Sequence, residues 1–123
     1  MFDEPDLYTK LRNKLVKKEL KLRVYVDRKS HQEKKAFFQH RRLSELREAG
    51  AQVFLCEGET RDGCWHKKAA VLDRRTLFSG GANFTRSGRR ANSELVYKLT
   101  GAPVEDVLTD LQEARERYPL WTA

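Results

Sequence analysis

The sequence contains little cysteine and no long apolar run. Its two cysteines, Cys56 and Cys64, could pair, but they are too few for a disulfide framework. Together with His66 they make a poor zinc set, because a fourth ligand and a different spacing would be needed. No stretch approaches the roughly 18 apolar residues that span a bilayer, and the opening MFDEPDLYTK is acidic and lacks an apolar signal core. The compartment stays open, with a cytoplasmic or mitochondrial location favoured over secretion.

Acidic residues are fewer than basic ones. The chain has 25 Lys and Arg against 18 Asp and Glu, which gives a net charge of +7. Such an excess favours a polyanionic partner, either nucleic acid or an anionic membrane surface, although a merely basic soluble chain has the same balance. With 39% hydrophobic and 35% charged residues in 123, the sequence predicts one folded domain over residues 1–123.

Hydrophobic periodicity predicts helices alternating with strands, and therefore an α/β chain with a mixed β-sheet flanked by helices. Ser30-x-x-Glu33 is a capping-box pattern, so the second helix is expected to begin there. We interpret the two histidines of that helix, His31 and His40, as surface residues. The predicted elements are an N-terminal helix within residues 1–20, a strand at 21–27, a helix at 30–49, a strand at 51–56, a hairpin at 65–79, a strand at 94–99 and a helix at 103–118.

Residues 65–83, WHKKAAVLDRRTLFSGGAN, concentrate the polar chemistry of the chain. In a strand, His66 and Lys68 project from the same face because they are two positions apart. Asp73 begins a turn, the pair Gly80-Gly81 allows the backbone to approach a ligand closely, and the Asn83 amide can donate a hydrogen bond. A titratable ring, a fixed positive charge, a glycine pair and an amide together form a workable cradle for a phosphate.

The spacing of these residues resembles the phospholipase D superfamily. The family signature H-x-K-x4-D-x6-G-[SG]-x-N is kept at every specified position from His66 to Asn83, and Glu94 fits the carboxylate that follows it in the family. The order of elements also resembles the single-motif members, which include bacterial phosphodiesterase-type nucleases and mitochondrial cardiolipin hydrolases. Domains of that group usually open with a strand, a helix and a central strand, which this chain is expected to lack. The chain would then be a piece of a longer protein, be completed by another chain, or have a reduced fold.

The resemblance implies roles for the motif residues. His66 would be either the nucleophile, which forms a phosphohistidine, or the acid/base, and Lys68 and Asn83 would bind the phosphate. Glu94 would orient His66, whereas Asp73, which leads into a turn, would serve structure more than chemistry. Side chains and backbone amides neutralise the phosphoryl oxygens in this family, so no metal ion or other cofactor is expected.

Residues around the motif are candidates for substrate binding. Gly80 and Gly81 would bring backbone donors to the phosphate, although Gly81 lacks the hydroxyl that a serine in this slot would supply. Trp65 could stack on a base or pack in the core. The remaining candidates, close in sequence and able either to contact a second phosphate or to lie on a solvated turn, are Arg86, Arg89 and Arg90.

The chain carries one motif, and this bears on its assembly. The family chemistry uses two histidines, so two His66 side chains would have to meet across a twofold axis in a homodimer. The resulting hypothesis is a metal-independent phosphodiesterase, foremost a nuclease acting on DNA or RNA. One alternative is a non-catalytic phospholipase D-like domain that binds or supports a larger assembly. Another is a hydrolase of an anionic, cardiolipin-type phospholipid, since a basic surface also suits linked lipid phosphates.

Overall fold

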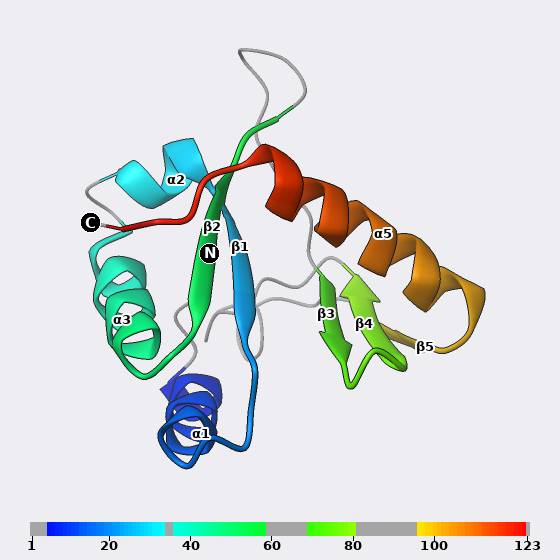
Figure 1. The fold of residues 1–123 in the computed structure, drawn as a ribbon, viewed down its shortest axis with the longest axis horizontal. Coiled ribbons are helices and arrows are strands. Elements are labelled where there is room, and N and C mark those ends of the chain that lie inside the picture. The colour runs from blue at the N-terminus through cyan, green and yellow to red at the C-terminus, as the bar shows by residue number, and fades with distance from the viewer. Residues whose placement is uncertain (1–4, 34–35, 59–68, 81–95, 123) are drawn as a thin grey trace. The chain divides into compact units, whose positions relative to one another are not determined.

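The computed structural model describes residues 5–33, 36–58, 69–80 and 96–122. The described chain combines helices with strands, and helices pack on both of its sheets, which confirms the α/β class with sheets flanked by helices (Figure 1). Among the described residues ahead of the first strand, the chain forms one helix. The elements are α1 Pro5–Val16, β1 Arg23–Asp27, α2 Arg28–Gln32, α3 Phe37–Glu48, β2 Gln52–Cys56, β3 Ala69–Leu72, β4 Thr76–Gly80, β5 Val96–Leu99 and α5 Ala102–Arg117.

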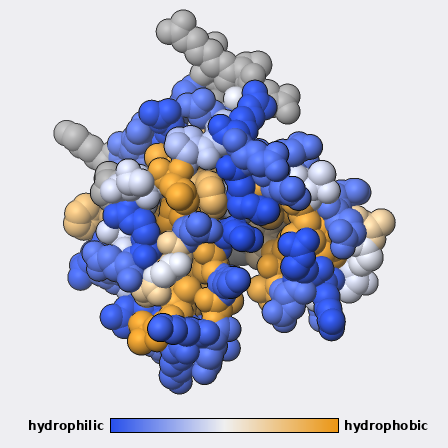
Figure 2. Space-filling view, viewed as in Figure 1, coloured by the Kyte–Doolittle hydropathy of each residue, from blue (hydrophilic) through white to orange (hydrophobic). Residues whose placement is uncertain are grey.

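The chain divides into two compact units. The first comprises Met1–His66 together with Tyr118–Ala123, and the second comprises Lys67–Arg117. Each unit has its own sheet, a parallel pair β1-β2 in the first and an antiparallel set β3-β4-β5 in the second. Hydrophilic residues cover most of the visible surface, with apolar residues exposed between them (Figure 2). That residues 1–123 act as a single domain stays a prediction.

The first unit is built on a strand-helix-strand crossover. Parallel strands cannot be joined by a tight turn, so α2 and α3 provide the connection between β1 and β2. The register pairs Val24 with Val53 and Val26 with Leu55. Val53 is fully buried, and α3 covers the sheet with two side chains that are also fully buried, Leu43 and Leu46. Their burial fixes the face that α3 turns to the sheet.

The end of the chain returns to the first unit and runs along the outer edge of β2 (Figure 1). The Trp121 amide donates to the Val53 carbonyl at 2.8 Å, and the Leu55 amide donates to the Pro119 carbonyl at 3.0 Å. Leu120 pairs with Phe54 in an antiparallel bridge. An exposed strand edge can pair with the strands of other chains. Pro119, Leu120 and Trp121 cover this edge of β2.

The N-terminal helix α1 lies within residues 1–20, as predicted, and packs on α3. Leu15 and Tyr8 are its buried residues, at 4% and 9% exposure. The Tyr8 hydroxyl donates to a carboxylate oxygen of Glu45 on α3. The guanidinium of Arg42 lies over the Tyr8 ring at 4.8 Å from its centroid, so Tyr8 contacts α3 both through its hydroxyl and through the face of its ring.

The predicted helix over residues 30–49 is wrong in its start and in its continuity. Asp27 is the N-cap of the short α2, and its Oδ2 accepts from the Ser30 amide at 2.9 Å. Ser30 therefore lies inside the helix, and the chain leaves helical geometry at Glu33 before α3 begins. The cap is therefore Asp27 and not Ser30, because Asp27, the last residue of β1, directly precedes α2 and its carboxylate accepts from an amide of the first turn.

The second unit confirms the predicted hairpin between residues 65 and 79 for its described part. β3 and β4 are antiparallel, with Ala69 opposite Ser79 and Leu72 opposite Thr76. β5 adds to the other side of β4, and α5 packs on β3 and β4. Leu77 of β4 is 2% exposed and Val104 of α5 is 1% exposed, so the core of this unit lies between the helix and the sheet.

Within residues 5–33, 36–58, 69–80 and 96–122, no helix is long and apolar enough to pass through a bilayer.

Candidate active site

Two residues of the predicted site, Asp73 and Gly80, fall in the described part of the chain. Of the two cysteines that could pair, Cys56 is buried and Cys64 lies outside that part. The other predicted site residues also lie outside the described residues: Trp65, His66, Lys68, Gly81, Asn83, Arg86, Arg89, Arg90 and Glu94. The roles of these residues stay predictions. The described strands β3, β4 and β5 show which ends of the sheet the motif is connected to.

The register of the second sheet brings three strand ends together. Ala69 at the start of β3 pairs with Ser79, the next-to-last residue of β4. Gly80 at the end of β4 pairs with Val96 at the start of β5. The start of β3, the end of β4 and the start of β5 therefore meet at one end of the sheet.

The beginning and the end of the sequence motif are both joined in sequence to that end of the sheet. Lys68 directly precedes β3 and His66 comes two positions earlier. Gly81 directly follows β4, and Glu94 comes two positions before β5. The first and second halves of the motif, separated by more than ten residues in the sequence, are thus connected to neighbouring strands at the same edge of the hairpin.

Asp73 lies at the opposite end of the hairpin. It follows the last residue of β3, a strand of four residues, so it is roughly 13 Å along the strand from Ala69. It is exposed and has a positive φ of 53°, a conformation that Asp adopts more readily than most residues. The Arg75 amide closes the turn by donating to the Leu72 carbonyl at 3.0 Å. This position fits the structural role that the sequence suggests for Asp73.

A pair of stacked histidines in the first unit is a feature that sequence reasoning missed. His31 is 1% exposed, so the interpretation of His31 as a surface residue is wrong, while His40 is half-buried. The two rings stack with centroids 3.9 Å apart and an interplanar angle of 10°. Trp121 meets both rings edge-on, at centroid distances of 4.6 Å from His31 and 5.4 Å from His40. The spacing of nine positions between the histidines gives no sequence signal for this contact.

Hydrogen bonds assign the ring protons of this pair. The Gln39 side-chain amide donates to His31 Nδ1 at 2.8 Å, so the His31 proton is on Nε2. His40 Nε2 donates to the His31 carbonyl. His31 Nε2 is buried and has no hydrogen-bond partner among the described residues.

The environment of His31 disfavours its charged form. Burial, and secondarily the nearby His40, lower the pKa of His31 from the usual 6.5 to about 4. The ring is therefore neutral at physiological pH and unsuited to acid/base work near neutrality. No group of three or more His, Cys, Asp or Glu that could hold a metal ion occurs in the part of the chain that the structure describes.

Comparison with known proteins gives a consistent result. A family model described as cardiolipin synthase, PLD-like domain, matches residues 1–116. The fold is similar to the crystal structure of Nuc from Salmonella typhimurium, described as a phospholipase D family member, with a TM-score of 0.80 and 18% sequence identity. The alignment covers 99% of this chain and 77% of that chain, and at this identity it shows a shared fold. A search of curated proteins found no match.

Proposed function

The chain belongs to the phospholipase D superfamily, whose members are generally phosphodiesterases, and we propose that it is a metal-independent nuclease that cleaves DNA or RNA. One observation carries the proposal. The motif from His66 to Asn83 keeps the family spacing, and its two halves are joined to strand ends that the register of β3, β4 and β5 brings together.

The proposed chemistry has two steps. In the first, a ring nitrogen of His66 attacks phosphorus and forms a phosphorus–nitrogen bond, while the bond to the leaving oxygen breaks. The leaving oxygen takes a proton from the imidazolium of His66 of a second copy. In the second step that neutral imidazole removes a proton from water, the hydroxide attacks phosphorus, and the phosphorus–nitrogen bond breaks.

The other motif residues stabilise charge during these steps. Lys68 and the Asn83 amide would neutralise the non-bridging oxygens, with backbone amides at Gly80 and Gly81. Glu94 would accept a hydrogen bond from the second ring nitrogen of His66, which fixes the tautomer that attacks. Because positive side chains and amide dipoles supply the neutralisation, the proposed reaction needs no metal ion.

Charge supports nucleic acid as the substrate. The net charge of +7 favours a strand that presents successive phosphates. The three arginines at positions 86, 89 and 90 closely follow the motif in sequence and would contact neighbouring phosphates. A phospholipid with linked phosphates is the second candidate, because the matching family model is described as cardiolipin synthase, PLD-like domain.

Hydrolysis of bis(p-nitrophenyl) phosphate in the presence of EDTA tests the reaction class. We expect metal-independent turnover that falls by at least about a hundredfold in His66→Asn, because the variant lacks the attacking nitrogen. Lys98→Gln is the matched control, since Lys98 is an exposed lysine on β5 outside the motif. Turnover that EDTA abolishes, or that survives in His66→Asn, would contradict the proposal.

The same preparations then decide the substrate. Labelled single-stranded DNA and RNA are compared with vesicles that contain cardiolipin, each with wild type and His66→Asn. Cleavage of the strands that depends on His66 supports the nuclease, and release of phosphatidic acid without strand cleavage supports the lipid hydrolase. A folded dimer that turns over none of these substrates would favour the non-catalytic alternative.

A further inference from the structure

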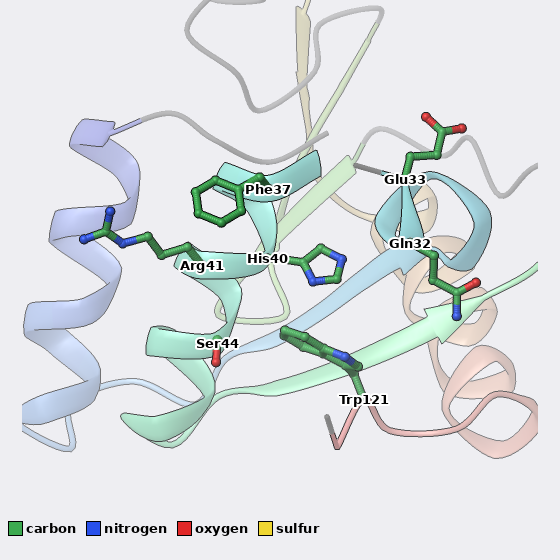
Figure 3. A pocket seen from close by; sticks show the side chains of 7 residues that line it. All are labelled: Gln32, Glu33, Phe37, His40, Arg41, Ser44 and Trp121. Carbon is green, nitrogen blue, oxygen red and sulfur yellow. The ribbon is translucent and has the colours of Figure 1, made fainter. Parts of the chain in front are cut away.

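The first unit carries an open depression beside the histidine pair (Figure 3). It is lined by residues of α2, α3 and the C-terminal segment, and its volume is about 830 Å³, within the range of small-molecule sites. Phe37, His40 and Ser44 are spaced so that they share one face of α3. Trp121 lies beneath the His40 ring, and the end of α2 supplies the opposite rim. The lining residues are Gln32, Glu33, Phe37, His40, Arg41, Ser44 and Trp121.

The lining combines two kinds of contact. Phe37, His40 and Trp121 offer aromatic surface, and Phe37 is 64% exposed although it is a large apolar side chain. Ser44 and Gln32 can both donate and accept hydrogen bonds, whereas the Glu33 carboxylate accepts them. A ligand that matches this set has flat apolar faces and an edge of donors and acceptors, which describes a nucleobase.

Charge at the rim fits a nucleotide. The side chain of Arg41 is 68% exposed, and its Nε lies 3.5 Å from a Glu45 oxygen, which leaves the terminal nitrogens of the guanidinium fork for a phosphate. Glu33 on the other rim suits a base with an exocyclic amino group, because that group donates hydrogen bonds.

We propose that this depression is a nucleobase subsite that holds one base of a single-stranded nucleic acid, stacked on Phe37 and edged by Ser44, Gln32 and Glu33. The proposal rests on the proposed nuclease function, because it assigns a contact to the same substrate. A membrane surface is the competing occupant for an exposed phenylalanine. It fits less well, because the site is concave, carries hydrogen-bonding side chains and includes a carboxylate that an anionic surface would repel.

Phe38 provides a matched control. It is 62% exposed, next to Phe37 in sequence, and absent from the lining of the depression. The two rings touch, with centroids 5.7 Å apart. Each substitution to alanine therefore removes the contact between the two rings and a similarly exposed ring. A difference in ligand affinity between the two variants is then due to the position of Phe37 in the depression.

The experiment measures fluorescence anisotropy of a labelled oligo(dC) of about ten nucleotides, a typical single-strand site size. The protein carries His66→Asn so that the strand stays intact. An abasic oligomer of equal length has the same phosphates without bases. We expect Phe37→Ala to weaken oligo(dC) binding about tenfold and to leave abasic binding unchanged. Phe38→Ala should leave both within about twofold, and Phe37→Trp should retain the affinity for oligo(dC).

Several outcomes would overturn the subsite. Equal losses in Phe37→Ala and Phe38→Ala would show that general exposed apolar surface is responsible. If Phe37→Ala weakens binding of oligo(dC) and of the abasic oligomer equally, the protein contacts only the phosphates. If oligo(dC) does not bind at all, a single-stranded nucleic acid is not the ligand. Binding to cardiolipin vesicles that both substitutions weaken, with oligo(dC) unaffected, would assign the face to a membrane.

The experiments distinguish an incorrect nucleobase subsite from an incorrect proposed function. The binding assay uses a chain in which His66 is replaced, so its result does not depend on turnover. Hydrolysis of bis(p-nitrophenyl) phosphate by the unsubstituted chain reports the phosphodiesterase chemistry on a substrate that carries no base.

Discussion

The stacked rings of His31 and His40, with centroids 3.9 Å apart, join the end of α2 to the first turn of α3. The edge of Trp121 closes over both rings from the C-terminal segment. Three segments far apart in the sequence therefore meet on one buried imidazole, and the protonation state of that imidazole should affect the stability of the first unit.

The first prediction concerns acid pH. The pKa of His31 is lowered by burial, and secondarily by His40, from 6.5 to about 4 in the folded protein. Between those values the unfolded chain binds a proton that the folded chain does not, so the free energy of unfolding falls as pH falls from about 6.5 to 4. The full loss is about 3 kcal/mol, since each pKa unit corresponds to about 1.4 kcal/mol.

Urea unfolding measured between pH 7 and pH 4.5 tests this prediction against His31→Asn. The asparagine amide nitrogen and oxygen stay uncharged throughout, so the variant should lack the additional loss at low pH. Because the carboxylates of the two proteins are the same, their contributions cancel in the difference. Parallel pH profiles for wild type and His31→Asn would show that His31 titrates normally.

The second prediction concerns the anchoring of the C-terminal segment. Arg47 Nη1 donates to the Trp121 carbonyl at 2.9 Å, and its guanidinium lies 4.5 Å from the centroid of the Trp121 ring. Arg47→Ala removes a charged hydrogen bond and a cation–π contact, so we expect a loss of about 2 kcal/mol in the free energy of unfolding. The exchange rate of the Leu55 amide, which donates to Pro119, should rise because the segment opens locally.

Arg12→Ala is the control for this substitution. Arg12 is an exposed residue of α1, so its replacement should change stability by less than about 0.5 kcal/mol. If Arg47→Ala and Arg12→Ala have the same free energy of unfolding and the same exchange rate of the Leu55 amide, the contacts of Arg47 with Trp121 do not anchor the C-terminal segment.

Local patterns in the sequence predict the elements whose partners are close or whose pattern is repetitive. The leucines of α1 recur every four residues, and the helix forms over Pro5–Val16 as this spacing indicates. The hairpin of β3 and β4 follows from two short apolar runs around Asp73-Arg74. In both cases the information lies within about 15 residues.

Tertiary contacts decide the features that sequence reasoning missed. Asp27 outcompetes Ser30 as a cap because β1 ends beside the first turn of α2. His31 is buried because Trp121, ninety positions away, folds over it. No periodicity encodes such a distant contact. For the candidate site the sequence supplies the motif spacing, while the pairing of Gly80 with Val96, which links Glu94 to the same sheet end, comes from the structure.

The third prediction concerns the turn between β3 and β4. Asp73 and Arg74 have φ values of 53° and 57°, in the left-handed region that favours glycine. An L-residue with a Cβ is strained there, whereas glycine is not. Arg74→Gly should therefore raise the free energy of unfolding by about 1 kcal/mol.

Arg75→Gly is the matched control, because Arg75 is the next exposed arginine and has no positive φ. It should lower the free energy of unfolding by about 0.5 to 1 kcal/mol, since glycine adds freedom to the unfolded chain there. Both values come from urea midpoints at pH 7. A gain in both variants, or a loss in both, would mean that side-chain charge rather than backbone geometry sets the effect.

The last prediction tests whether two copies share the reaction. In the proposed mechanism His66 of one copy attacks and His66 of the other protonates the leaving oxygen, so a mixed dimer with one His66→Asn chain is inactive. After equal amounts of wild type and His66→Asn are mixed and allowed to exchange, about half of the wild-type chains sit in mixed dimers. Activity per wild-type chain should therefore fall to about half.

Mixing wild type with Lys98→Gln in the same way should leave activity per chain unchanged, which controls for dilution and exchange. If the His66→Asn mixture also keeps its full activity per wild-type chain, and labelled chains show that exchange has occurred, then one His66 suffices. The second proton donor would then have to come from the same chain, where His31 is buried and neutral and His40 donates to the His31 carbonyl. That arrangement leaves no histidine available among the described residues, so a halved activity is the outcome that the sequence and the fold together support.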